Sequence, residues 1–161
     1  MSGRVFGVIR PYEEWLREQV FAFLDSLDYR LGKDMIVPEG TADEAAVAWL
    51  VQQRLDLLLL PYHKHRSDDG RFVDGIGVAL QLPERWSSRS RRVPILMPVT
   101  EFSLGASFER RFDLLREKRP EVADQVILMP ESQIGSADLA ARIREIAASG
   151  PERTNGLDGG G

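Results

Sequence analysis

The sequence has no cysteine, which excludes disulfide bonds, thiolate nucleophiles and cysteine-ligated metal centres. Long apolar runs are missing too, because the longest, Leu57 to Leu60, falls far short of the roughly 20 residues that span a bilayer. The first residues, Met-Ser-Gly-Arg, lack the features of a signal peptide. These absences lead us to expect a cytoplasmic protein that does not contact membranes.

A strong charge of either sign is also absent. The 21 lysine and arginine residues and the 25 aspartate and glutamate residues give a formal net charge of −4. Nucleic-acid binding calls for a basic surface, which this balance does not supply, so we expect no nucleic-acid partner. One local arginine cluster, in residues 85–92, is interpreted as a solvated loop. Apolar residues make up 43% of the 161, the proportion typical of a globular domain.

Short apolar runs alternate with segments of helical periodicity along the chain. The apolar runs predict strands at residues 5–9, 29–37, 56–60, 93–99 and 125–128. The periodic segments predict helices at residues 11–27, 41–51, 72–82, 108–118 and 136–146. Such alternation implies right-handed crossovers between parallel strands. We therefore predict an α/β fold of three layers (αβα) around a five-stranded parallel sheet.

The predicted domain occupies residues 1–148. Residues 149–161 hold one aliphatic side chain and show no periodicity, so they are predicted to form a disordered tail. In open parallel sheets the functional crevice lies outside the carboxyl ends of the strands. The residues that the sequence places at these ends are Arg10, Pro11, Pro61 to Asp69, Val99 to Ser103 and Met129 to Gln133.

Several of these segments resemble those of response-regulator receiver domains. The run Asp56 to Leu60 resembles the strand that ends in the phospho-acceptor aspartate, and Asp69-Gly70 resembles the Asp-Gly that opens the third helix. Pro94 to Thr100 resembles the fourth strand with its terminal threonine, and Val126 to Pro130 resembles the fifth strand ending in Lys-Pro. The resemblance covers residues 4 to 148 and implies a flavodoxin-like, receiver-like fold with a role in signal transduction.

The chemical positions of a receiver are occupied by unsuitable residues here. An aspartyl-phosphate switch needs a carboxylate nucleophile, a magnesium ion and a neighbouring cation. The resemblance places Pro61 at the nucleophile, Arg10 and Pro11 at the metal-binding acids, and Met129 at the lysine. Thr100 alone keeps the family's functional residue. We therefore interpret the chain as a pseudo-receiver that acts without phosphorylation, catalysis, metal or cofactor, through a protein partner or a second copy of itself.

Arg10 has two interpretations. Its guanidinium can pair across the crevice with Asp68 or Asp69, which would fix the charge of the site without metal or phosphate. Alternatively, Arg10 points into solvent. The sequence does not decide between them.

A partner-binding face is also implied by the resemblance. In receivers the fourth helix, fifth strand and fifth helix commonly form the dimer or output surface. The candidates for that face are Phe102, Phe108, Arg110, Arg111 and Phe112. The alternative is that the three phenylalanines belong to the core.

The sequence leaves room for three other functions. His63 and His65 with the aspartates at 68 and 69 could bind a metal, but a solvated loop is the preferred interpretation. The run Asp74 to Ala79 faintly resembles TIR-like and deoxyribosyltransferase-like N-glycosidases, which would act on NAD or a nucleoside. Such chemistry rests on a glutamate, and no acid follows Asp74 before Glu84. A small-ligand or nucleotide sensor with Arg10 and Thr100 as anion contacts remains a third possibility.

Overall fold

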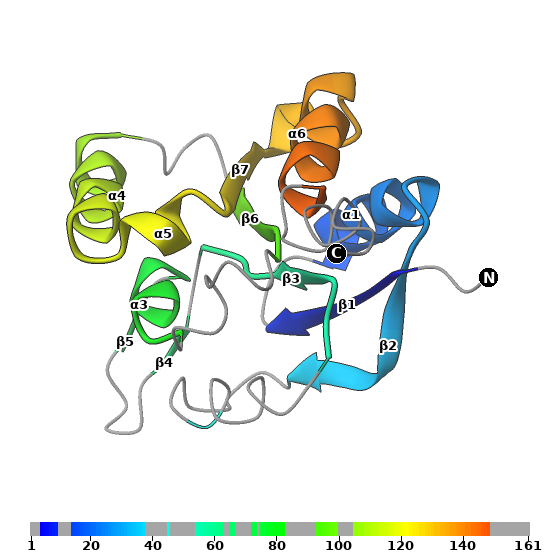
Figure 1. The fold of residues 1–161 in the computed structure, drawn as a ribbon, viewed down its shortest axis with the longest axis horizontal. Coiled ribbons are helices and arrows are strands. Elements are labelled where there is room, and N and C mark those ends of the chain that lie inside the picture. Colours follow the sequence, from blue (N-terminus) through cyan, green and yellow to red (C-terminus); the bar gives the residue numbers. More distant parts are fainter. Residues whose placement is uncertain are drawn as a thin grey trace, which may run out of the picture.

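The computed structural model describes residues 4–9, 14–37, 45, 54–62, 65–66, 72–73, 75–82, 93–99 and 105–148. The strands are β1 (Arg4–Ile9), β2 (Tyr29–Val37), β3 (Leu57–Leu59), β4 (His65–Arg66), β5 (Phe72–Val73), β6 (Ile95–Val99) and β7 (Val126–Pro130). The helices are α1 (Glu14–Ser26), α3 (Gly75–Leu80), α4 (Ala106–Lys118), α5 (Pro120–Ala123), the 3-10 turn η3 (Glu131–Gln133) and α6 (Ala137–Ala147) (Figure 1).

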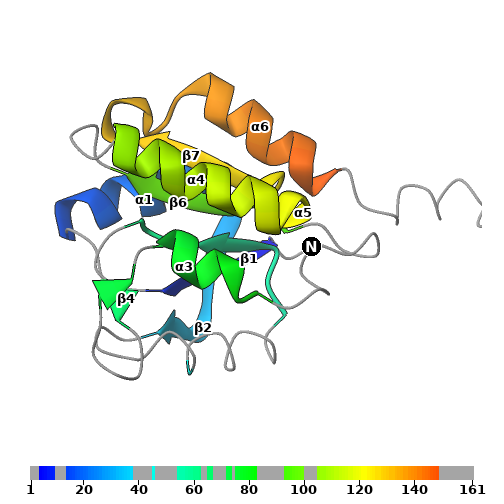
Figure 2. The same ribbon diagram turned by 90° about the vertical axis from the view of Figure 1, so that its left-hand side faces the viewer.

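Five parallel strands form the central sheet in the order β2-β1-β3-β6-β7, which confirms the predicted architecture. The helices α1 and α6 cover one face, while α3, α4 and α5 cover the other (Figures 1 and 2). Within the described residues, no helix is both long enough and apolar enough to cross a membrane.

The central strand β3 is buried on both faces. Leu58 packs with the α3–α4–α5 layer, whereas Leu57 and Leu59 pack with the α1–α6 layer. All three side chains are fully buried. Burial on both sides explains why this strand is a continuous apolar run rather than an alternating one.

The predicted second strand is present, with an irregularity in its pairing. Phe6 of β1 pairs with Leu31 of β2, yet Val8, two residues later, pairs with Ile36. Residues 32–35 therefore bulge out of the ladder between these two pairs. The glycine and charged residues at 32–34, which interrupted the apolar pattern, lie within this bulge.

The predicted helix over residues 72–82 is wrong at its start. Phe72–Val73 forms β5, which pairs antiparallel with β4. The helix α3 begins only at Gly75. Phe72 and Val73 fit a helical stripe by spacing, but cross-strand pairing determines their conformation instead.

The helix predicted over residues 108–118 ends at residue 118, and Pro120 begins a further short helix. The helix α4 ends at Lys118. Arg119 then leaves the helical conformation, with φ −139° and ψ 67°, and Pro120 begins α5. The Arg119 guanidinium donates to the Leu80 carbonyl at 3.0 Å and to the Glu121 carboxylate at 2.9 Å. This arginine therefore ties the junction of α4 and α5 to the end of α3.

The final helix follows the prediction. The Ser136 hydroxyl oxygen accepts a hydrogen bond from the Leu139 amide at 3.2 Å, which caps the first turn of α6. Leu139, Ile143 and Ile146 are buried along one stripe. The predicted helix over 41–51 (apart from residue 45), the arginine cluster in 85–92 and the predicted tail over 149–161 lie outside the described residues.

Gly75 lies where α3 meets the end of β3, and a side chain there should destabilise the fold. A Cβ atom at this position would lie 2.7 Å from the Pro61 carbonyl oxygen and 3.2 Å from the Met97 methyl carbon. Because backbone must move to relieve the contact, Gly75→Ser should lower the free energy of unfolding by about 1–3 kcal/mol. Gly105→Ser, with nothing within 4 Å, should leave it nearly unchanged in the same urea titration. Equal effects at the two sites would contradict the packing described.

Tyr29 gives the core a dependence on alkaline pH. Its side chain is 1% exposed, and burial raises the pKa of its hydroxyl above 10.0, an effect partly opposed by the Arg4 guanidinium. Above the ordinary pKa the hydroxyl ionises in the unfolded chain before it does so in the folded protein. The free energy of unfolding should therefore fall as the pH rises beyond about 10.

Urea titrations at several pH values between about 8 and 11 measure this loss. Tyr29→Phe should reduce it, because the variant has no hydroxyl to ionise, whereas Tyr62→Phe should retain it. An unchanged loss in Tyr29→Phe would show that other groups cause the alkaline sensitivity.

Candidate functional site

The carboxyl ends of β1, β3, β6 and β7 meet at one edge of the sheet, since these neighbouring strands are parallel. Of the five predicted receiver positions, the structure describes Pro61 and Met129. Arg10, Pro11 and Thr100 lie outside the described residues, as do Asp68 and Asp69. The convergence of all five positions and the pairing of Arg10 with an aspartate therefore stay predictions.

The position after β3 is a packed junction. Pro61 is buried, and its carbonyl oxygen faces Gly75 at the start of α3. Tyr62, the next residue, receives a hydrogen bond on its carbonyl from the Gly75 amide at 2.8 Å and donates its own amide to the Pro98 carbonyl at 3.0 Å. Backbone contacts and an apolar ring thus occupy the end of β3.

Met129 belongs to the core. Its side chain is 1% exposed and packs in the same cluster as Ile127, Leu139 and Ala140, between β7 and α6. A thioether is neutral and cannot supply the positive charge that stabilises a phosphoryl group. The two described positions, Pro61 and Met129, therefore carry neither a carboxylate nor a positive charge.

The residues predicted for the partner face differ in how far they are buried. Phe108 and Phe112 are 2% and 8% exposed, the packing expected of core residues, while Arg110 is exposed and Arg111 half-buried. Phe102 lies outside the described residues. Burial thus agrees with the alternative interpretation for the two described phenylalanines.

A row of contacting aromatic side chains runs from the end of β3 to the surface of α4. The rings of Tyr62 and Phe108 meet edge to face, with centroids 5.0 Å apart, and Phe108 stacks on Phe112 at 6.0 Å. The Arg116 guanidinium carbon lies 4.4 Å from the Phe112 ring centroid. Such contacts add to the energy of burial, so the row links the packed junction to an exposed cation.

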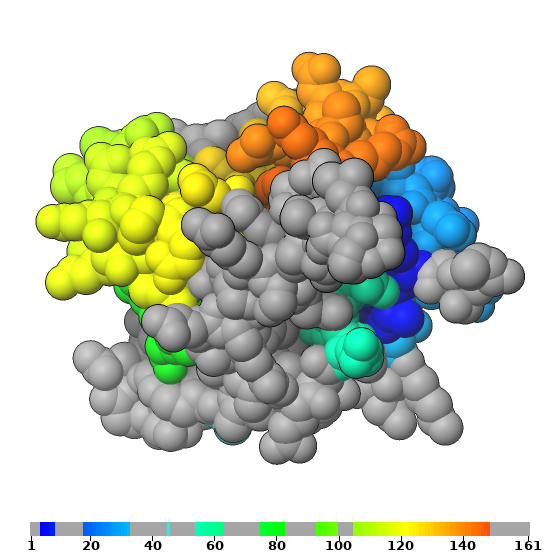
Figure 3. All heavy atoms as spheres, in the orientation of Figure 1, coloured from blue at the N-terminus to red at the C-terminus, as the bar shows by residue number. Residues whose placement is uncertain are grey.

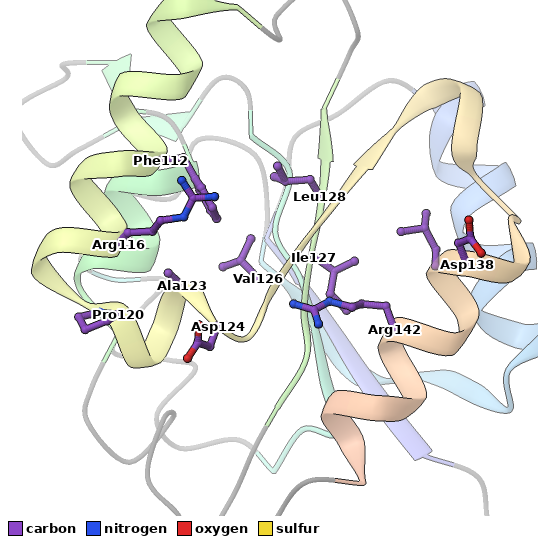
Figure 4. A pocket seen from close by; sticks show the side chains of 11 residues that line it. Phe112, Arg116, Pro120, Ala123, Asp124, Val126, Ile127, Leu128, Asp138 and Arg142 are labelled. Carbon is purple, nitrogen blue, oxygen red and sulfur yellow. The ribbon is translucent and has the colours of Figure 1, made fainter.

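A hollow of about 610 Å³ lies along β7, between α4 and α5 on one side and α6 on the other (Figure 4). In Figure 3 the yellow surface of α4 and α5 and the orange surface of α6 stand on the two sides of this strand. Its lining residues are Phe112, Arg116, Pro120, Ala123, Asp124, Val126, Ile127, Leu128, Asp138, Leu139 and Arg142. Except for Phe112, the sequence prediction missed them, although the place of the fifth strand at the edge of a receiver-like sheet could have indicated them.

The two arginines of the hollow form only weak, exposed ion pairs. Arg116 pairs with Asp113 at 3.0 Å, and Arg142 pairs with Glu145 at 3.6 Å, each within one turn of helix. Between 49% and 71% of each of the four side chains is exposed. Ion pairs this exposed contribute less than about 1 kcal/mol, so both arginines can exchange partners at small cost.

The described residues offer no group of three or more histidine and acidic side chains able to hold a metal ion. The histidine–aspartate cluster proposed from the sequence depends on residues 63, 68 and 69, which the structure does not describe. Of the segment compared with N-glycosidases, residues 75–79 belong to α3, and Gly75, Ile76, Val78 and Ala79 are buried. A buried apolar helix is poorly suited to contact a sugar or a base.

No family model and no curated protein matches the sequence. Among solved structures, NtrX from Brucella abortus in complex with ADP overlaps 98% of this chain at 13% identity and a TM-score of 0.55. NtrX in complex with ATP gives 14% identity and 0.54 over the same share. The chain spans only 29–30% of these NtrX chains.

The response regulator ChrA of a heme-sensing two-component system matches at 16% identity and a TM-score of 0.47, over 98% of this chain and 65% of that one. The overlap with NtrX, together with the parallel strand order, shows that the fold of this chain is the flavodoxin-like fold of receiver domains.

The burial of Phe108 leads to a clear contrast between two neighbours on α4. Phe108→Ala should lower the free energy of unfolding by about 3–5 kcal/mol, because it empties a core site beside Tyr62 and Phe112. Arg110→Ala should change it by about 0.5 kcal/mol or less, since the arginine is exposed. Chemical denaturation of both variants measures the difference. A mild effect of Phe108→Ala would assign that ring to a surface role.

Proposed function

We propose that this domain is a pseudo-receiver: a signalling or scaffold domain that works by protein–protein contact and without phosphorylation. The observation that carries the proposal is the junction at the end of β3, where buried Pro61 packs against Gly75. A receiver needs an accessible carboxylate at this place. Here the site is filled by backbone and apolar groups.

The neighbouring position supports the same conclusion. Met129 is buried and uncharged, so even a phosphate delivered to this edge would find no cation on β7. Because the two described positions lack the required chemistry for independent reasons, one substitution would not restore a phosphorylation switch.

The surface around β7 is the proposed site of protein contact. It combines an apolar floor with exposed arginines and aspartates on both walls, a composition that suits a protein interface. The partner is another protein or a second copy of this chain. The N-glycosidase alternative is not favoured, because the helix it depends on is packed into the core.

Phosphoryl donors test the proposal directly. Incubation with acetyl phosphate and magnesium should leave the intact mass unchanged, and beryllofluoride should leave the amide NMR spectrum unchanged. The reason is that the described edge supplies neither a carboxylate at position 61 nor a cation at position 129. A phosphorylatable receiver domain treated in parallel is the positive control.

The variant Pro61→Asp should also stay unphosphorylated, because Met129 still provides no positive charge. A gain of one phosphoryl mass in the natural protein, together with spectral changes at the carboxyl ends of the strands, would overturn the pseudo-receiver proposal.

A further inference from the structure

The backbone along the outer edge of β7 can pair with another strand. The Ile95 amide donates to the Gln125 carbonyl at 2.9 Å, so odd-numbered residues of this segment turn their backbone groups toward β6. Backbone groups alternate along a parallel strand, which means that Val126 and Leu128 direct their N–H and C=O groups outward. In the described part of the chain, no strand lies on that side.

The hollow follows this edge rather than either face of the sheet. Val126, Ile127 and Leu128 all line it, although successive side chains of a strand point to opposite faces. A space that three consecutive residues share must run along the strand's side. The backbone of β7 therefore forms its floor, and the helices on both faces form its walls (Figure 4).

Each wall contributes one arginine and one aspartate: Arg116 and Asp124 on the α4–α5 side, and Arg142 and Asp138 on α6. The two arginines are the groups that can bind carboxylates. Arg116 reaches in from α4, and Arg142 reaches in from α6 toward Ile127 (Figure 4). The side chain of Leu128, whose backbone groups point outward, packs with the α4 layer. The side chain of Ile127 packs with the α6 layer. An added strand follows the same alternation, so two successive side chains of it would meet the two arginines, one on each wall.

We propose that an extended acidic segment of a partner protein adds to β7 as a sixth strand, with two adjacent carboxylates meeting Arg116 and Arg142. The inference rests on the proposed function and specifies the partner for that surface. Ladder hydrogen bonds to Val126 and Leu128 supply affinity, and the carboxylates supply selectivity. The arginines exchange the exposed Asp113 and Glu145 for these carboxylates at little cost.

The probe is a synthetic eight-residue peptide with two adjacent glutamates at its centre, flanked on each side by three valine or threonine residues. We expect saturable binding by fluorescence anisotropy. A peptide with lysines in place of the glutamates, and one N-methylated at the amides that face β7, should each bind at least about tenfold more weakly. The methylated peptide keeps every side chain and charge, so it isolates the backbone ladder.

On the protein side, Arg116→Gln with Arg142→Gln should weaken binding of the glutamate peptide about tenfold or more. The matched control is Lys118→Gln with Arg144→Gln, which changes the same two helices and the same charge outside the hollow. Hydrogen exchange gives a second readout: without peptide the Leu128 amide should exchange faster than the Ile127 amide, and peptide should slow it.

Equal binding of the glutamate and lysine peptides would overturn the proposed chemistry, and equal binding of the methylated peptide would overturn strand addition. Absence of glutamate-peptide binding would overturn both. If sedimentation shows a dimer that the double arginine variant dissociates, the occupant is a second copy and the peptide proposal fails. None of these results alters the response to phosphoryl donors, which tests the proposed function separately.

Discussion

Burial of β3 on both faces is the constraint on which the rest of this domain depends. Leu57 and Leu59 must be covered by one helical layer and Leu58 by the other, so neither layer can be dispensed with. Parallel pairing with β1 and β6 follows, because helical crossovers cover both faces of a sheet. The same strand then delivers Pro61 to the edge where related folds carry out their chemistry. Here the core continues to that edge, where Pro61 is buried against Gly75.

The sequence predicted the architecture well where one physical rule dominated. The apolar run at β3 and the helix predicted over residues 136–146 depend on local periodicity, and the structure shows both. The segment at Phe72–Val73 failed because its conformation depends on pairing with residues 65–66, which spacing cannot reveal. The contact of Arg119 with the carbonyl of Leu80, 39 positions away, is likewise outside the reach of local periodicity.

The candidate site was predicted from the resemblance, and its chemistry stays a prediction. Pro61 and Met129 could be recognised as chemically unsuitable because they are aligned with a familiar strand order. The hollow beside β7 could not be recognised in the same way, since it arises from how α4, α5 and α6 project beyond an edge strand. The partner face is a mixed case, because Phe112 lies in the core yet still lines the hollow. Exposure alone would assign such a residue to one role when it has two.

The double position of Phe112 has an evolutionary consequence. Its ring stacks on Phe108 within the core and carries Arg116 on its outer side, so one substitution alters both the interior and the hollow beside β7. Related sequences would therefore change positions 62, 108, 112 and 116 together rather than singly. In a lineage that acquired a new partner at this surface, the covariation would extend to positions 62 and 108, which do not line the hollow.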